Sequence, residues 1–117
     1  MQDLPSFPYF KSDLTATAVL VKTGSIRMET LEFLNKDANQ IFVQLFNKAA
    51  AADVTLGTTT PDLSYIVPPG DGTNYSATSK DFPKGLRFPK GLVIAATTTV
   101  AGSTASASNA IANITIS

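Results

Sequence analysis

Residues Asp81 to Ala96 read DFPKGLRFPKGLVIAA, in which the pentapeptide Phe-Pro-Lys-Gly-Leu occurs twice before an apolar segment. Neither copy contains a thiol, an imidazole or a hydroxyl nucleophile, so the repeat indicates backbone geometry rather than catalysis. Proline fixes φ and removes a backbone donor, whereas glycine can adopt positive φ. We therefore predict two successive bends, one at Pro83 and Gly85 and one at Pro89 and Gly91, with the flanking Phe and Leu side chains buried.

The rest of the chain consists of short apolar or alternating segments separated by turn-forming residues. From Ile26 to about Asn35, apolar residues alternate with polar ones, but Met28 and Leu31 fall out of phase. Such a slip predicts a β-bulge near Glu29 or Thr30. About seven or eight such segments, with turn signals roughly every 8–12 residues, predict an all-β fold, namely an antiparallel β-sandwich or a jelly-roll-like domain.

The length of the chain predicts one domain. We expect residues 13–117 to form the sandwich and residues 1–12 to form an extended N-terminal arm, because Pro5 and Pro8 favour extended backbone. The arm is too apolar for a solvated tail, since it carries Leu4, Phe7, Tyr9 and Phe10. It either folds back over the chain's own core or docks on a neighbouring subunit.

The segment from Gln40 to Phe46 predicts a strand that is apolar on both faces. Three aliphatic residues point to one face, and Phe42 and Phe46 point to the other. Such a strand is either central and covered on both sides, or it lends one face to a partner. The apolar residues of the arm and of this second face form the candidate partner interface: Leu4, Phe7, Tyr9, Phe10, Phe42 and Phe46.

The composition argues against several classes of function. Nine basic and nine acidic residues give zero net charge, which removes the attraction that most nucleic-acid binding requires. The chain has neither Cys nor His, so disulfides, thiolate catalysis and the commonest general base and zinc ligand are all missing. We expect no enzymatic activity, no metal and no cofactor. No apolar run is long enough to span a membrane, and no secretory leader is visible.

Four acidic residues lie in predicted loops, nine or ten residues apart: Asp53, Asp62, Asp71 and Asp81. Carboxylate pairs at a defined separation hydrolyse glycosidic bonds, but turn-forming Asp is the stronger interpretation, because its side chain satisfies local backbone donors. A sugar-binding module is a further hypothesis. Its aromatic platform would be thin, since Trp is absent and the tyrosines are scattered.

Two longer strings resemble a family of small structural proteins of tailed bacteriophages: VQLFNKAAAADVTLGTTTPDLSYIVPPG (Val43 to Gly70) and FPKGLRFPKGLVIAATTTVAGSTA (Phe82 to Ala105). The shared motifs are a strand ending in Val-Gln-Leu-Phe, an Ala-rich turn, a Leu-Gly-Thr-Thr-Xaa-Pro loop, a Pro-Pro-Gly turn, the Phe-Pro-Lys-Gly segment and an Ala-Ala-Thr-Thr-Thr stretch. These motifs occur in the same order. The first ten or so residues and the segment from Tyr75 to Lys80 match least.

The resemblance implies a virion component assembled in the cytoplasm of the host bacterium, most plausibly a head decoration or cement protein. Its partners would be the major capsid protein or other virion proteins. Self-association would let several weak contacts add, so we expect a homo-oligomer, with a trimer favoured. The alternative is a tail fibre, baseplate or spike component with a carbohydrate-binding β-sandwich. The resemblance carries over no catalytic residue.

Overall fold

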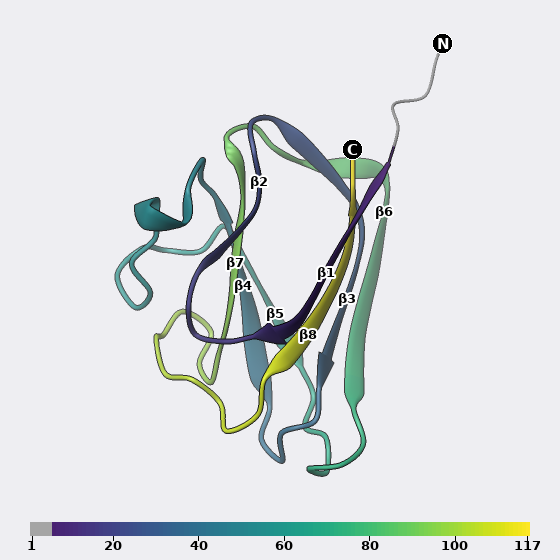
Figure 1. The fold of residues 1–117 in the computed structure, drawn as a ribbon, viewed down its shortest axis with the longest axis vertical. Helices are drawn as coiled ribbons and strands as arrows, with labels where there is room; N and C mark the ends of the chain where they lie inside the picture. Colours follow the sequence, from purple (N-terminus) through teal and green to yellow (C-terminus); the bar gives the residue numbers. More distant parts are fainter. Residues whose placement is uncertain (1–5) are drawn as a thin grey trace.

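A computed structural model describes residues 6–117, which form eight strands and one 3-10 helix (Figure 1). None of these residues belongs to a helix long and apolar enough to cross a membrane. The 3-10 helix, η1, covers Ala51–Asp53. The strands are β1 Phe7–Leu14, β2 Val19–Thr23, β3 Ile26–Asn35, β4 Ile41–Asn47, β5 Leu63–Val67, β6 Ser76–Phe88, β7 Gly91–Thr97 and β8 Ala110–Ile116.

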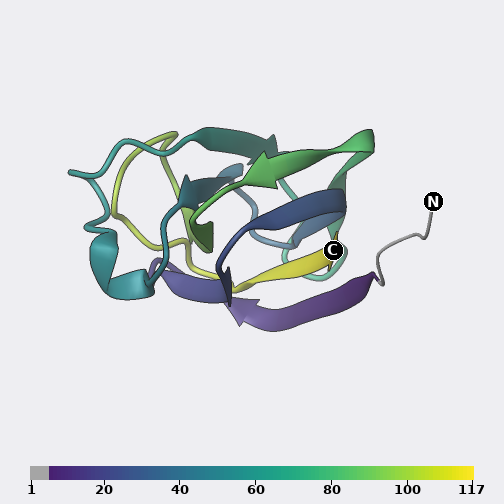
Figure 2. The same cartoon turned by 90° about the horizontal axis from the view of Figure 1, so that it is seen from above.

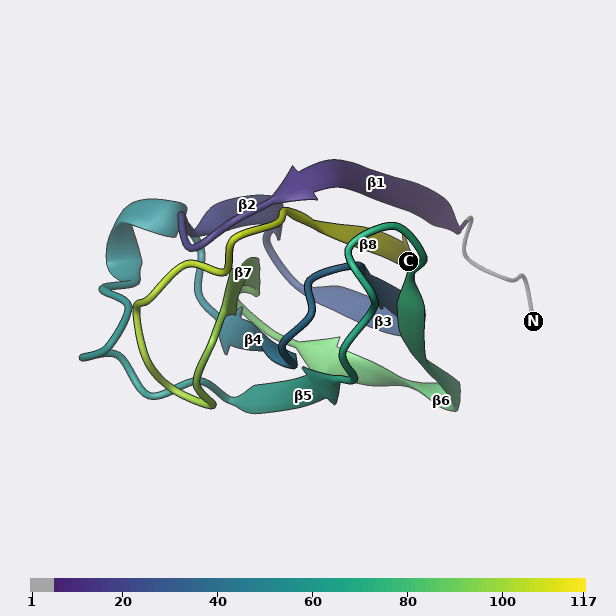
Figure 3. The ribbon, with the colours of Figure 1, turned by 90° about the horizontal axis from the view of Figure 1, so that it is seen from below.

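The strands form two four-stranded sheets in which every paired strand is antiparallel. The strand order is β1-β8-β3-β6 in one sheet, called here the β1 sheet, and β2-β7-β4-β5 in the other, called the β4 sheet. Figures 2 and 3 show the two sheets as facing layers. This is the order of an eight-stranded jelly roll. The predicted all-β sandwich is confirmed.

The hydrophobic core lies between the two sheets. Along β8, the alanines and isoleucines at every second position are buried, while the residues between them are half-buried on the opposite face. This alternation is the period of two that a strand imposes on its side chains. Partners from the β4 sheet complete the core, notably Ile41, Val43 and Leu45 of β4 and Leu92 and Ile94 of β7.

A β-bulge in β3 lets one strand bury four large apolar side chains. Against β8, Met28 and Thr30 face the consecutive residues Ile116 and Thr115, so Glu29 is the extra residue. The extra residue changes the phase of the strand, and the apolar residues on both sides of it therefore point into the core: Ile26, Met28, Leu31 and Phe33. The predicted bulge is confirmed at its predicted position.

The first Phe-Pro-Lys-Gly copy forms a wider bulge in β6, opposite Glu29. Asp81 faces Thr30 and Leu86 faces Met28, so residues 82–85 have no partner in the ladder of β3. Proline fits here because it has no hydrogen to donate to that ladder. Gly85 has a φ of 74°. This copy therefore produces the predicted bend.

The second copy forms the turn between β6 and β7, which contains Pro89 and ends at Gly91. Gly91 has a φ of 143° and is buried. A Cβ at this position would lie 2.6 Å from the carbonyl oxygen of Lys48 and 2.8 Å from that of Lys22. The second predicted bend is confirmed, and glycine is required there for space as well as for φ.

The outer face of β4 is covered by the chain itself. The Nε2 atom of Gln44 donates to Thr97 Oγ1 at 2.6 Å and to the carbonyl oxygen of Gly102 at 3.0 Å. The connection between β7 and β8, residues 98–109, therefore folds over this face. Strand β4 lies between β7 and β5 and is buried on both sides, which is the first of the two arrangements considered for it.

A buried carboxylate and a buried amide together tie three loops at one end of the sandwich. Asp37 is 4% exposed and accepts hydrogen bonds from the backbone N–H groups of Asn39 and Ser108, at 2.9 and 3.0 Å. The side-chain amide of Asn35 donates to the carbonyl oxygens of Asn39 and Pro68. The N–H of Asn39, followed by that of Ser108, holds the pKa of Asp37 below its usual range despite its burial.

We predict that Gly91→Ala lowers the free energy of unfolding by about 1–3 kcal/mol, because alanine adds both φ strain and a clash with two backbone carbonyls. Gly24→Ala is the matched control, since Gly24 also has positive φ but nothing within 4 Å of an added Cβ. Equilibrium unfolding in urea measures the free energy of unfolding of both variants. Equal losses would show that the close approach at Gly91 has no cost of its own.

The lowered pKa of Asp37 predicts an acid-sensitive stability. An Asp in an unfolded chain titrates at about pH 4, so the ionised carboxylate stabilises the fold above that pH, and this stabilisation is lost as pH falls through the lower folded pKa. Asp37→Asn should lower stability at neutral pH and flatten its decline below about pH 4. Thermal melts over a pH series test this. An unchanged acid dependence would contradict it.

Candidate functional site

The predicted N-terminal arm is, from Phe7 onward, an edge strand. Strand β1 pairs with β8, placing Phe7 opposite Ile116 and Leu14 opposite Ala110. The expectation of an arm over residues 1–12 is thus corrected for residues 7–12, which fold back onto the chain's own sheet. The reason is a break in register between Lys11 and Leu14, which shifts the phase of the strand so that both Tyr9 and Leu14 contact the core although they are five residues apart. Leu4 lies outside the described residues.

Two of the predicted interface residues are exposed on β1. The side chain of Phe7 is 51% exposed and that of Phe10 is 64% exposed. Tyr9 lies between them, half-buried against the core, and burial raises the pKa of its phenol. Phe7 and Phe10 are three positions apart in a regular part of the strand, so they project from opposite faces of β1. Two exposed phenylalanines on one edge strand mark that edge as a candidate contact region.

The free edge of β1 is poorly suited to pairing with another strand. Pro8 removes one donor from the strand, and Lys11 and Asp13 form an ion pair at 3.1 Å. Proline and charged side chains are the features that block edge-to-edge addition. A partner at this edge would therefore be bound by side chains rather than by an added strand.

The second pair of predicted interface residues does not form an exposed surface. Phe46 is fully buried, and Phe42 is half-buried. The connection between β4 and β5 folds back beside Phe46, because Asp62 donates its N–H to Leu45 and accepts one from Asn47. Phe46 is therefore wrong as an interface residue, since the chain's own loops cover the face that it occupies.

The outer face of the β1 sheet contains a groove of about 440 Å³, called here the outer-face groove. Phe10 lines this groove, and so do two carboxylate side chains, those of Glu32 and Asp81. Glu32 stands between its two cross-strand neighbours, Asn113 and Ser79, whose side chains donate to it at 3.5 and 3.3 Å. The volume is within the range of ligand and contact sites.

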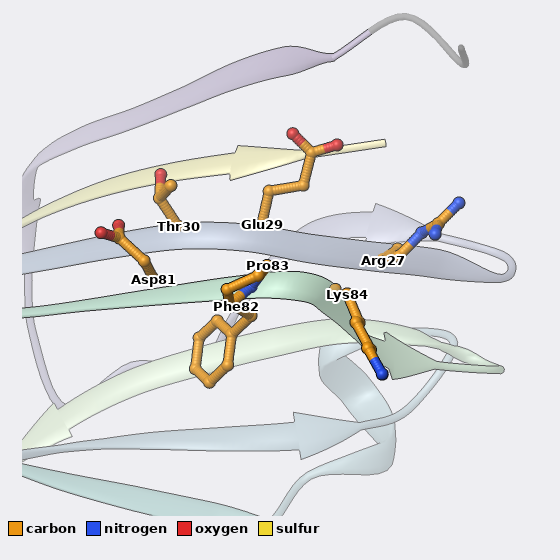
Figure 4. Close-up of a pocket in the computed structure, with 8 residues that line it drawn as sticks. Arg27, Glu29, Thr30, Asp81, Phe82, Pro83 and Lys84 are labelled. Atoms are coloured by element: carbon orange, nitrogen blue, oxygen red, sulfur yellow. The ribbon is translucent and has the colours of Figure 1, made fainter. Parts of the chain in front are cut away.

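The paired bulges create a second hollow beside the outer-face groove, of about 380 Å³. Figure 4 shows Glu29, Thr30 and Asp81 pointing away from the β4 sheet, whereas Phe82 points toward it. Arg27 and Lys84 lie at the opposite end from Asp81. The sequence did not predict that these residues lie together, because their proximity depends on the register of β3 against β6 rather than on a local motif.

Two of the carboxylates predicted in loops, those of Asp62 and Asp71, accept hydrogen bonds from backbone N–H groups. Asp71 accepts from the N–H groups of Thr73 and Asn74, the second of which does most to lower its pKa. The turn-forming interpretation is confirmed for Asp71. Asp81, expected in a loop, is instead within β6. Over residues 6–117, no three Asp or Glu side chains gather into a group that would hold a metal ion.

The tyrosines do not form a stacking platform in the part of the chain that the structure describes. Tyr65 is half-buried against Phe33, with ring centroids 6.5 Å apart, and its burial raises its pKa. Tyr75 is exposed but carries the ammonium group of Lys36 over its ring, 5.9 Å from the centroid. Tyr9 lies on another strand. Sugar stacking therefore gains no support from these three rings.

The chain was compared with protein-family models and with curated proteins, and it matches none of them. The strand order places the protein in the class of β-sandwich domains with jelly-roll topology.

We predict opposite outcomes for two phenylalanines that the sequence grouped together. Phe46→Ala should lower the free energy of unfolding by about 3–5 kcal/mol, because it opens a cavity in a closed face. Phe10→Ala should change it by no more than about 0.5 kcal/mol, because the ring is mostly in solvent. Chemical denaturation of both variants measures the difference, and comparable losses would show that Phe10 is part of the core.

Proposed function

We propose that this protein is a structural component of a tailed-bacteriophage virion, and that it decorates or cements the head. The observation that carries the proposal is a closed jelly roll that leaves two phenylalanines exposed on a blocked edge strand. Jelly rolls occur in viral capsid domains and in lectins, so the fold is compatible with the role without defining it. The phage-like motifs described above favour the capsid alternative.

The rest of the surface supports a binding role. Charged residues make up 15% of the chain, against about 25% in typical globular proteins, and hydroxyl side chains take their place. A weakly charged surface tolerates close packing against neighbouring subunits. The sandwich is also well closed, because both faces of β4 are covered and Asp37 joins its own loop to the connection between β7 and β8.

The partners in this proposal are the major capsid protein or other virion proteins, and further copies of this chain. Phe7 and Phe10 supply apolar contacts, one on each face of the edge strand. Aromatic side chains that enter a partner's pocket carry much of the binding free energy in protein interfaces. Because Pro8 and the Lys11–Asp13 pair block strand addition, side-chain docking is the mode of contact that this edge supports.

The proposal is tested by a binding experiment with heads of the encoding phage that were assembled without this protein. Purified protein should co-sediment with them saturably, and Phe7→Ser should weaken binding by about tenfold, which is the loss of one moderate contact. Val100→Ser is the matched control, because Val100 is 55% exposed but lies in the connection between β7 and β8.

Failure of the unaltered protein to bind heads would contradict the decoration role. Equal binding by the two variants would remove Phe7 from the contact.

A further inference from the structure

We propose that the outer face of the β1 sheet is self-complementary, and that it pairs with the same face of a second copy in a twofold dimer. One end of this face is basic and the other is acidic. The inference does not depend on the virion role, since it concerns the isolated chain in solution.

The basic end is a hollow of about 300 Å³ lined by Arg27, Lys84 and Arg87. Arg27 faces Arg87 directly across β3 and β6. Like charges at directly opposed positions destabilise a sheet, so this pair has a cost unless an anionic group approaches it. Arg27 and Arg87 therefore present two positive charges that favour an acidic partner, whereas the side chain of Lys84 points toward the β4 sheet, as that of Phe82 does (Figure 4).

Both guanidinium groups are held in place. The stem of Arg27 occupies the space that a side chain at Gly85 would take, since an added Cβ would lie 1.8 Å from Arg27 Cδ. The Nη2 atom of Arg87 donates to Ser25 Oγ at 3.2 Å. Positioned charges lose less conformational entropy on binding than freely moving ones do.

The acidic end is the outer-face groove. Glu32 and Asp81 line it, and none of the described residues that line it is a Lys or an Arg. Asn113 and Ser79 fix the carboxylate of Glu32 from both sides. Phe10, 64% exposed, lies beside them and offers an apolar surface at the same place.

The two ends do not neutralise each other within one copy. Lys11–Asp13 is the one ion pair among residues 6–117. In Figure 4, Arg27 and Asp81 lie at opposite ends of the hollow formed by the bulges, and Glu29 lies between them without forming an ion pair with Arg27. The charges of one copy thus remain available to another.

Charge complementarity makes a second copy the best occupant of this face. A twofold axis lying in the plane of the contact exchanges the two ends, so each basic end meets the acidic groove of the other copy. Both contacts then form in one interface. A chain with zero net charge meets no overall repulsion on dimerising. Because the contacts are exposed ion pairs, the dimer should be weak and sensitive to salt.

Charge reversal at each end tests the proposal. One variant carries Arg27→Glu and Arg87→Glu, and the other carries Glu32→Lys and Asp81→Lys. Light scattering with size-exclusion chromatography should find the unaltered chain as a dimer at high concentration. Each reversed variant should be monomeric, because its face carries one sign of charge. An equimolar mixture of the two should form a heterodimer, since the faces then attract at both ends.

The mixture separates loss of contact from loss of fold, because a misfolded variant would not recover on mixing. Lys22→Glu with Lys90→Glu is the control for total charge, and it should leave the dimer intact, since neither lysine lines the face. Raising salt from about 0.1 to 1 M, which shortens the screening length from roughly 10 to 3 Å, should dissociate the unaltered dimer. A chain that stays monomeric, a trimer, or a mixture that fails to associate would overturn the proposal.

Discussion

The structure depends on one geometric constraint, which is that β3 must bury apolar side chains on both sides of a phase slip. A regular strand would leave either Ile26 and Met28 or Leu31 and Phe33 in solvent. The extra residue, Glu29, restores the phase, and β6 accommodates it with the unpaired residues 82–85. Since β3 lies between β8 and β6, this pair of bulges sets its register against both neighbours.

The same bulges shape the outer face of the β1 sheet. A bulge re-aims side chains, and this one leaves Arg27 and Lys84 at one end of a hollow and Asp81 at the other. The outer face of the β4 sheet, by contrast, is not open to a partner, because the chain's own connections cover it over Phe46 and Gln44. The open β1 sheet and the exposed rings of β1 are therefore where partners would be expected to bind.

The sequence predicted the features that depend on local pattern. Alternation located the bulge in β3, and Pro and Gly located both bends of the repeat. It misjudged the first residues, because an edge strand with prolines has the same composition as an arm until its partner, β8, is known. Phe46 was misassigned for a similar reason, since its cover comes from loops distant in sequence. The opposed pair Arg27 and Arg87 depends on register across a bulge, which no local motif encodes.

The proposed role as a decoration protein of the phage head is tested most directly by the copy number of the chain in purified virions. Quantitative mass spectrometry would measure this number against the major capsid protein, with microscopy to exclude the tail tube. The account predicts a copy number comparable to that of the capsid protein. A handful of copies would assign the chain to a fibre, baseplate or spike, and absence from the virion would contradict the structural role.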